Sequence, residues 1–168
     1  MASSFAGSFL VARPVIQDPN FRRSVVLLIQ HGEGGAFGLV VNRPAKVEGV
    51  PFTVYAGGPC QSPGLLMLHG HREWASEDED QPSPELAPGI FLGDAHSVRR
   101  ISDDPTEDGL RFRMFVGYAG WGPGQLEEEL ASGSWAVVAA SGQVLFESAV
   151  ENVWKDLLPP MLPQPSLN

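Results

Sequence analysis

Apolar residues in this chain gather in short runs that glycine and proline separate. Residues 24–30 (SVVLLIQ) are almost continuously apolar and rich in β-branched side chains, which is typical of a strand covered on both faces. A glycine-rich stretch, residues 32–35, follows this run, and a second apolar run extends over 36–42 (AFGLVVN). A connection of this length and composition between two apolar runs predicts a β-hairpin.

Shorter apolar runs predict the remaining strands. Residues 8–16 (SFLVARPVI) are apolar, and Pro14 keeps the residue before it extended. From Arg111 to Phe115 polar and apolar residues alternate, as expected of a half-exposed strand. Together these patterns predict strands at 8–16, 24–30, 36–42, 52–56, 65–69, 89–92 and 111–117.

Helices are predicted only in the second half of the chain, and they are short. Residues 94–101 begin with an aspartate that is able to cap a helix. Residues 123–133 begin with proline and carry two leucines four positions apart, and residues 148–158 place apolar side chains at spacings of three and four. Strands that precede and enclose a few helices, without a regular βαβ alternation, predict an α+β fold.

Composition limits the class of protein further. The 168 residues include 15 prolines and 19 glycines, so long helices are not expected. The single cysteine excludes an internal disulfide, and no apolar run approaches the roughly 20 residues that span a bilayer. No basic segment precedes the short apolar patch at the N-terminus, unlike a secretory signal. We expect a cytoplasmic protein with one domain over residues 1–168, an acidic loop at 73–88 and a frayed tail from about residue 160.

The charge is unevenly distributed along the chain. The formal net charge is -9, yet residues 1–60 carry more basic than acidic side chains. The five cations of this first part are Arg13, Arg22, Arg23, Arg43 and Lys46. They suffice to line one anion pocket but not to coat a duplex, and no helix-turn-helix pattern is present. Direct binding to nucleic acid is therefore not expected.

Several short motifs contain residue types that are able to bind or react. Residues 32–38 lack the lysine and hydroxyl of a phosphate-binding loop and fit a hairpin turn better. Residues 120–124 (GWGPG) lie between a strand and a helix, where they form either an anion contact or an ordinary turn. His69 and His71 share one face of a strand, but the chain holds only four histidines and no metal site is expected. Cys60 is expected to be a bystander thiol.

Three blocks of sequence resemble the bacterial YqgE/AlgH family. They are residues 7–44, the turn at 57–59 (GGP) and residues 117–135 (GYAGWGPGQLEEELASGSW). The chain departs from the family pattern between the first two blocks, where it is shortened, and in the acidic loop. The resemblance implies an α+β fold in which a bent, branched, mostly antiparallel sheet forms a pseudo-barrel flanked by a few short helices.

The resemblance also points to a set of residues for a shared site, although it implies no established activity. The positions that match the motifs are Arg13, Asp18, Pro19, Phe21, Arg22, Ser24, Asn42, Gly57, Gly58, Pro59, Gly124, Gln125 and Trp135. From them we take as candidate ligand-binding residues Arg13, Asp18, Arg22, Asn42, Gly57, Gly58, Gly124 and Gln125. No catalytic residue, metal or cofactor is assigned.

Two interpretations of Asp18 and Arg22 are compatible with the sequence. The two side chains, four positions apart across a turn, either pair with each other and brace the first strand or leave Arg22 to hold an anion. In the second case, Arg13 is the alternative donor to Arg22, and backbone N–H groups from 57–58 or from the start of the 123–132 helix complete the pocket. Trp121 and Trp135 are expected to anchor that helix on the sheet.

Three functions are compatible with these patterns. We expect a non-catalytic binding or regulatory protein whose partner is a small anion or another protein. The first alternative is an enzyme of unknown reaction that uses reactive residue types such as Asp18, Ser24, His31 or Cys60, although no recognised motif joins them. The second is a transcriptional regulator, a description given to some relatives, that acts through a protein partner or, less readily, through DNA.

Overall fold

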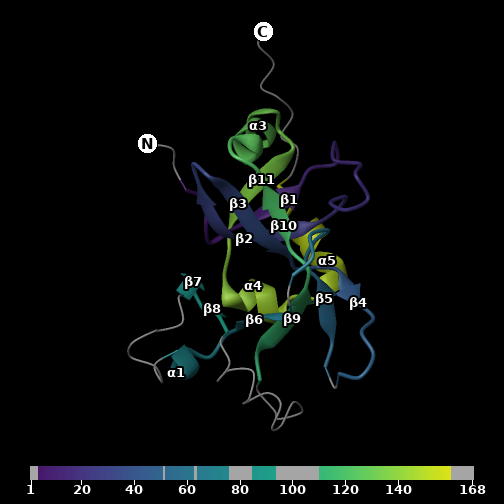
Figure 1. The fold of residues 1–168 in the computed structure, drawn as a ribbon, viewed down its shortest axis with the longest axis vertical. Helices are drawn as coiled ribbons and strands as arrows, with labels where there is room; N and C mark the ends of the chain where they lie inside the picture. The colour runs from purple at the N-terminus through teal and green to yellow at the C-terminus, as the bar shows by residue number, and fades with distance from the viewer. Residues whose placement is uncertain (1–3, 51, 63, 76–84, 94–109, 160–168) are drawn as a thin grey trace.

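The computed structural model describes residues 4–50, 52–62, 64–75, 85–93 and 110–159. Its strands form two sheets, one in each half of the molecule, with short helices beside and between them (Figure 1). The α+β class and the mostly antiparallel pairing are confirmed, and no closed barrel is present among the described strands. The predicted helix at 94–101, most of the acidic loop and the tail from residue 160 lie outside the described residues.

The first sheet is entirely antiparallel and contains the predicted hairpin. Its order is β10 (Ala119–Trp121), β3 (Gly35–Val40), β2 (Val25–Gly32), β1 (Ser8–Ala12) and β11 (Trp135–Ala139). Strand β1 is shorter than predicted, because the chain turns at Pro14. Strands β10 and β11 were not predicted, although β11 pairs with all of β1, from Ser8 opposite Ala139 to Ala12 opposite Trp135.

The second sheet is mixed. Its order is β4 (Pro44–Ala45), β5 (Val54–Ala56), β9 (Phe112–Val116), β6 (Leu66–His69), β8 (Ile90–Leu92) and β7 (Glu85–Ala87). Only β5 and β9 run parallel. The four predicted strands in this region are confirmed with shorter bounds, whereas β4 and β7 were not predicted because they are only two or three residues long.

Two of the predicted helices are confirmed and two further helices are present. These elements are α1 (Arg72–Ala75), α3 (Gln125–Ala131), α4 (Gly142–Glu147) and α5 (Val150–Leu157). Helices α3 and α5 fall inside the ranges that the sequence indicates. Helix α4 was not predicted because it begins at a glycine, a residue that disfavours helices. The hydroxyl of Ser141 caps it by accepting the N–H of Val144. Within the described ranges, no helix is long and apolar enough to cross a membrane.

The first sheet is buried on both faces, and each face belongs to a different core. Phe9 and Leu27 face a core that includes Leu68 and Phe115 of the second sheet and Val153 of α5. The alternating residues of β1 and β2 face a smaller core that α3 covers. The sheet is therefore fixed from both sides, and the loops at its ends are presented from a rigid frame.

Candidate functional site

The loop that joins β1 to β2, residues 13–24, holds three of the candidate residues, Arg13, Asp18 and Arg22, and we call it the arginine loop. Its neck is closed by the N–H of Ala12, which donates to the carbonyl of Ser24 over 2.9 Å. The antiparallel register of β1 and β2, with Val11 opposite Val25, leads up to this neck, and Arg13 and Arg23 are the basic residues next to it in the sequence. Both ends of the loop thus carry basic residues.

The predicted ion pair between Asp18 and Arg22 is absent from the part of the chain that the structure describes, so that interpretation is wrong. A carboxylate oxygen of Asp18 instead accepts the N–H of Asn20 over 2.8 Å, and its backbone carbonyl accepts the N–H of Arg22 over 2.7 Å. Asp18 thereby shapes the turn through its own backbone, as aspartate often does. Within the described ranges, the exposed side chain of Arg22 makes neither a hydrogen bond nor an ion pair.

Asn42 and Arg43, which follow β3, hold the arginine loop in place. Asn42 accepts the N–H of Val25 at Oδ1 over 3.0 Å and donates from Nδ2 to the carbonyl of Arg23 over 2.9 Å. Arg23 needs this restraint because its φ of 57° lies in the left-handed region, which is uncommon outside glycine. Asn42 is thus a structural member of the candidate set.

The guanidinium of Arg43 completes this restraint. It donates to the carbonyls of Arg22, over 2.6 Å, and of Asn20. Burial lowers the pKa of the Arg43 guanidinium, and the nearby charge of Asp18 opposes that shift. Arg43 remains charged at any physiological pH and therefore keeps its hydrogen bonds to the backbone of the loop. These bonds use the backbone carbonyl of Arg22 and not its side chain.

An Asn42→Ala variant is expected to lose about 2 kcal/mol of unfolding free energy, since it leaves the buried N–H of Val25 and the carbonyl of Arg23 without partners. Urea denaturation measures this loss. Asn42→Asp is the matched control, because it keeps the acceptor for Val25 and removes only the donor to Arg23. A smaller loss in Asn42→Asp supports the two-bond restraint, and an unchanged Asn42→Ala protein contradicts it.

Phe21 connects the arginine loop to α3. Its ring packs between Trp121 and Trp135, with ring centroids 6.1 and 5.9 Å away. Both indole N–H groups donate to Oε1 of Glu129 in α3, over 3.1 and 2.9 Å, while Oε2 accepts from Gln125 over 3.1 Å. The predicted role of the two tryptophans as anchors of this helix is confirmed.

Glu129 was not among the predicted residues, although the sequence holds one signal for it. Glu129 lies three positions after the buried Leu126, so it falls on the inward face of α3, where a carboxylate needs partners. Gln125 is exposed, but its side chain is also used, since its Oε1 accepts the N–H of Gly122 over 3.0 Å. Gly124 is exposed and takes a left-handed φ of 76° immediately before the helix.

Gly57 and Gly58 lie where the two sheets approach each other. The N–H of Gly57 donates to the carbonyl of Val116 and its carbonyl accepts the N–H of Val40, both over 2.8 Å. A Cβ on Gly58 would come within 2.2 Å of the Tyr118 carbonyl, so only glycine permits this contact. The amide of Gly57 is thus used within the fold.

The structure therefore brings the candidate residues together in two ways. Arg13, Asp18, Arg22 and Asn42 belong to the arginine loop or contact its backbone, and the Phe21–tryptophan cluster links this loop to the helix that Gly124 and Gln125 begin. Gly57 is connected to this region through the end of β3, because its carbonyl accepts the N–H of Val40. Arg13 and Arg22 are the members of the set whose side chains the described fold leaves without a hydrogen bond or an ion pair.

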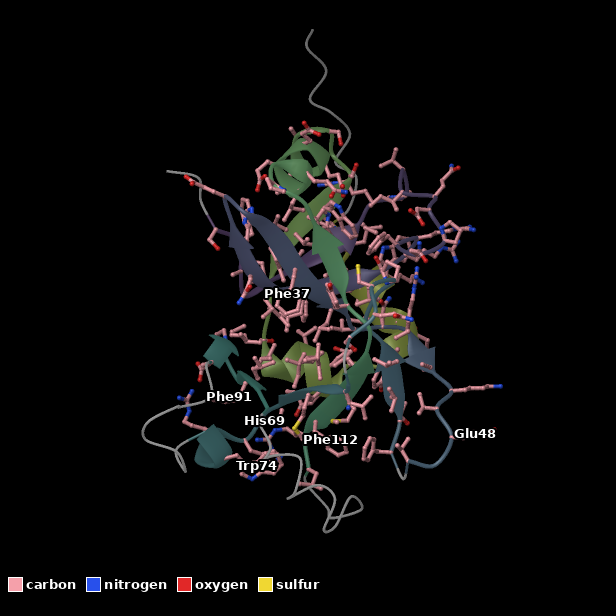
Figure 2. All side chains as sticks on the ribbon, in the orientation of Figure 1. Phe37, Glu48, His69, Trp74, Phe91 and Phe112 are labelled. Atoms are coloured by element: carbon pink, nitrogen blue, oxygen red, sulfur yellow. The ribbon has the colours of Figure 1, made fainter. Side chains whose placement is uncertain are left out.

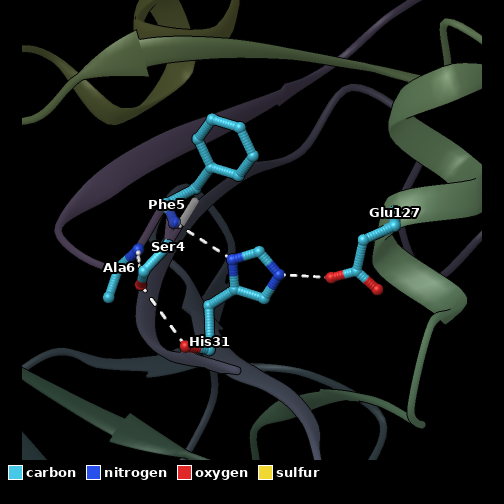
Figure 3. A network of polar contacts seen from close by, with 5 residues as sticks. All are labelled: Ser4, Phe5, Ala6, His31 and Glu127. Atoms are coloured by element: carbon cyan, nitrogen blue, oxygen red, sulfur yellow. Dashed lines mark hydrogen bonds and ion pairs between the residues drawn. The ribbon is translucent and has the colours of Figure 1, made fainter. Parts of the chain in front are cut away.

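The reactive residue types do not form a nucleophile and base within the described ranges. Ser24 is buried and donates its hydroxyl to the carbonyl of Phe21 over 2.6 Å. His31 lies elsewhere, beside a groove of about 710 Å³ whose walls include Phe37 and Trp121. There Nδ1 accepts the N–H of Phe5 over 3.0 Å, and Nε2 contacts a carboxylate oxygen of Glu127 (Figure 3).

Glu127 owes its electrostatic state to this contact. The hydrogen bond from His31 lowers the pKa of the Glu127 carboxyl below its ordinary value. Any stability that comes from this shift is present above the ordinary glutamate pKa and is lost as pH falls through the lowered one. The effect belongs to strongly acidic conditions, well below the range in which histidines titrate.

His69 and His71 lie in an aromatic cluster at the far end of the second sheet. The ring of His69 lies 4.9 Å from that of Trp74 and 5.5 Å from that of Phe91, measured between centroids, and Figure 2 shows these three side chains close together. Nδ1 of His69 accepts the N–H of His71 over 3.1 Å. Among the described residues, no group of three or more potential metal ligands is present.

Comparison with known proteins identifies relatives of this chain. The AlgH-like family profile matches residues 9–166. A UPF0301 protein of Myxococcus xanthus is 32% identical over 98% of this chain and 94% of its own length, and one of Streptomyces coelicolor is 37% identical over 93% and 86%. The solution structure of the AlgH protein from Pseudomonas aeruginosa is 30% identical, with a TM-score of 0.64 over 88% of this chain and 84% of its own. The crystal structure of a Corynebacterium diphtheriae protein is 26% identical, with a TM-score of 0.74 over 93% and 86%.

Proposed function

This chain belongs to the AlgH-like family, and from its geometry we propose that it is a non-catalytic binding or regulatory protein whose arginine loop holds a small anion. The ligand class is a molecule with a phosphate or carboxylate group, held by the forked donors of Arg13 and Arg22. The observation that carries the proposal is the restraint of the loop by Asn42 and Arg43, which fixes its backbone while the Arg22 side chain has no hydrogen bond or ion pair among the described residues.

Charge supports the same proposal. Arg13, Arg22 and Arg23 all lie in the arginine loop, in a protein whose net charge is -9. The positive charge of Arg23 already has an interaction within the fold, because its guanidinium lies over the ring of Trp154, 5.8 Å from the centroid. The guanidinium groups of Arg13 and Arg22 remain to attract an anion.

A non-catalytic role fits the surroundings of the reactive side chains. The hydroxyl of Ser24 and both ring nitrogens of His31 take part in hydrogen bonds of the fold itself. A general base needs a nitrogen or oxygen free to meet the substrate, and the carboxylate of Asp18 in the arginine loop already accepts the N–H of Asn20.

The wider role is part of the proposal. We place the protein in the cytoplasm, and we infer that any effect on transcription passes through a protein partner. The arginine loop carries three cations, Arg13, Arg22 and Arg23, which are too few for the many phosphate contacts that DNA binding requires. An acidic partner protein would use the same arginines as a small anion.

Arg22→Ala tests the proposal in the full chain, with pyrophosphate as the probe and calorimetry as the measurement. Because no described residue contacts the Arg22 side chain through a hydrogen bond or an ion pair, unfolding free energy is expected to change by less than about 0.5 kcal/mol. Loss of a forked, charged donor set is expected to weaken pyrophosphate binding by about tenfold or more.

Arg72→Ala is the matched control, because it removes the same charge from α1 at the opposite end of the molecule (Figure 1). Its pyrophosphate affinity is expected to equal that of the unaltered protein. The proposal fails if Arg22→Ala loses stability while binding is unchanged, or if the two variants bind equally well.

A further inference from the structure

His31 joins three segments that are far apart in the sequence. Its ring contacts the N-terminal segment Ser4–Gly7 through Phe5 and contacts α3 through Glu127, 96 residues away, as Figure 3 shows. The Ser4 hydroxyl donates to the backbone carbonyl of His31, and the ring of Phe5 stacks on the imidazole at 5.7 Å and 15°. The side chain of His31 is only 2% exposed.

The contacts of His31 select one tautomer of the neutral ring. Because the N–H of Phe5 donates to Nδ1, that nitrogen holds a lone pair and no proton. The ring proton is therefore on Nε2, where it is donated to the Glu127 carboxylate. A positively charged ring carries protons on both nitrogens, so its Nδ1–H would face the N–H of Phe5 as a second donor.

We propose that His31 is a proton-sensitive latch that holds Ser4–Ala6 against the β2–β3 hairpin when neutral and releases it when charged, while the N–H of Gly7 stays bonded to the carbonyl of Leu28. Ala6 of this segment forms part of the wall of the 710 Å³ groove beside His31, so release widens the groove. Protonation gives a histidine ring a second N–H and a positive charge, so the latch responds to the protonation of this one side chain. This inference does not depend on the arginine loop.

The surrounding charges determine which contact breaks. Among the described residues, Glu127 of α3 is the only charged side chain that the structure places in contact with His31, and Ser4–Gly7 carry no titratable side chain. Across the hairpin, Ala36 lies opposite His31, and the exposed Glu33 is at the hairpin tip. Glu127 stabilises a charged imidazole at Nε2, so the contact with α3 survives protonation while the contact with Phe5 is lost.

Nuclear magnetic resonance of the full chain tests the latch in two readings. Long-range spectra of the imidazole nitrogens report which nitrogen carries the proton. Hydrogen exchange of the Phe5 amide reports whether its bond to Nδ1 of His31 is formed. While His31 is neutral we expect the Nε2–H tautomer and a protected Phe5 amide. As His31 becomes charged, Phe5 exchange, corrected for its intrinsic dependence on pH, is expected to rise about tenfold.

The amide of Gly57, bonded to Val116 in the interior, serves as the internal control and is expected to stay protected. Glu127→Gln keeps an acceptor for Nε2–H but removes the charge, so release of Phe5 is expected at a lower pH in this variant. The inference is overturned by an Nδ1–H tautomer, by Phe5 exchange that ignores the titration of His31, by joint loss of Phe5 and Gly57 protection, or by an unchanged midpoint in Glu127→Gln.

Discussion

Gly58→Ala is expected to lower the free energy of unfolding by about 4 kcal/mol, a loss that few single substitutions in a folded protein reach. The new Cβ would lie 2.2 Å from both carbonyl atoms of Tyr118, and these atoms belong to backbone that cannot rotate away. The φ of 151° at Gly58 adds strain for any residue with a side chain. Relief requires the segment before Cys60 to move away from β10, which disturbs the junction of the two sheets.

Urea denaturation measures this loss, and Gly34→Ala is the control. Gly34 lies at the tip of the β2–β3 hairpin, and a Cβ there has no heavy atom within 4 Å. Its stability is expected to stay within about 1 kcal/mol of the unaltered protein. If both variants are equally stable, the close approach at Gly58 does not hold the sheets together, and its occurrence in the GGP turn needs a ligand-based explanation.

Glu129→Ala is expected to cost about 3 kcal/mol of unfolding free energy. The substitution removes the shared acceptor of the Trp121 and Trp135 indoles and leaves two buried N–H groups without a partner. It also frees Gln125, whose amide donates to the same carboxylate. Because Phe21 packs between the two indoles, loosening of the cluster is expected to reach the arginine loop as well.

Thermal and urea denaturation measure the stability of Glu129→Ala and of two comparison variants, which show whether the loss comes from the indole contacts. Glu128→Ala removes the same charge from a neighbour on the same helix and is expected to change stability by less than about 0.5 kcal/mol. Glu129→Gln keeps one acceptor oxygen for the indoles and is expected to be intermediate. Equal losses in Glu128→Ala and Glu129→Ala would show that helix charge, not the indole contacts, determines the effect.

Local sequence signals were sufficient for the elements whose partners are close in the chain. The β2–β3 hairpin and helix α3 were predicted because an apolar run, a glycine turn and a helix start are each readable over a few residues. Strand β11 was missed although WAVVA is apolar, since its partner β1 lies at the other end of the sequence. The division into two sheets depends on such long-range pairings, which periodicity does not encode.

The candidate site divides in the same way. The basic loop was found from residue types alone, and so was the anchoring of α3 by its tryptophans. The restraint by Asn42 and Arg43 was not predicted, because their partners are backbone groups about 20 positions earlier, and backbone groups carry no sequence signal. The Asp18–Arg22 pair was wrong for a related reason: spacing allowed it, but the carboxylate found a nearer donor in its own turn.

In the function that we propose, the arginine loop is a rigid frame that offers guanidinium groups to an anion. The most direct test follows the Nε–H signals of the arginines by nuclear magnetic resonance while pyrophosphate is added to the full chain. We predict saturable shifts at Arg13 and Arg22, with Arg72 and Arg111 unaffected. Equal, non-saturating shifts at all four arginines, or no shift at Arg13 and Arg22, would contradict the account.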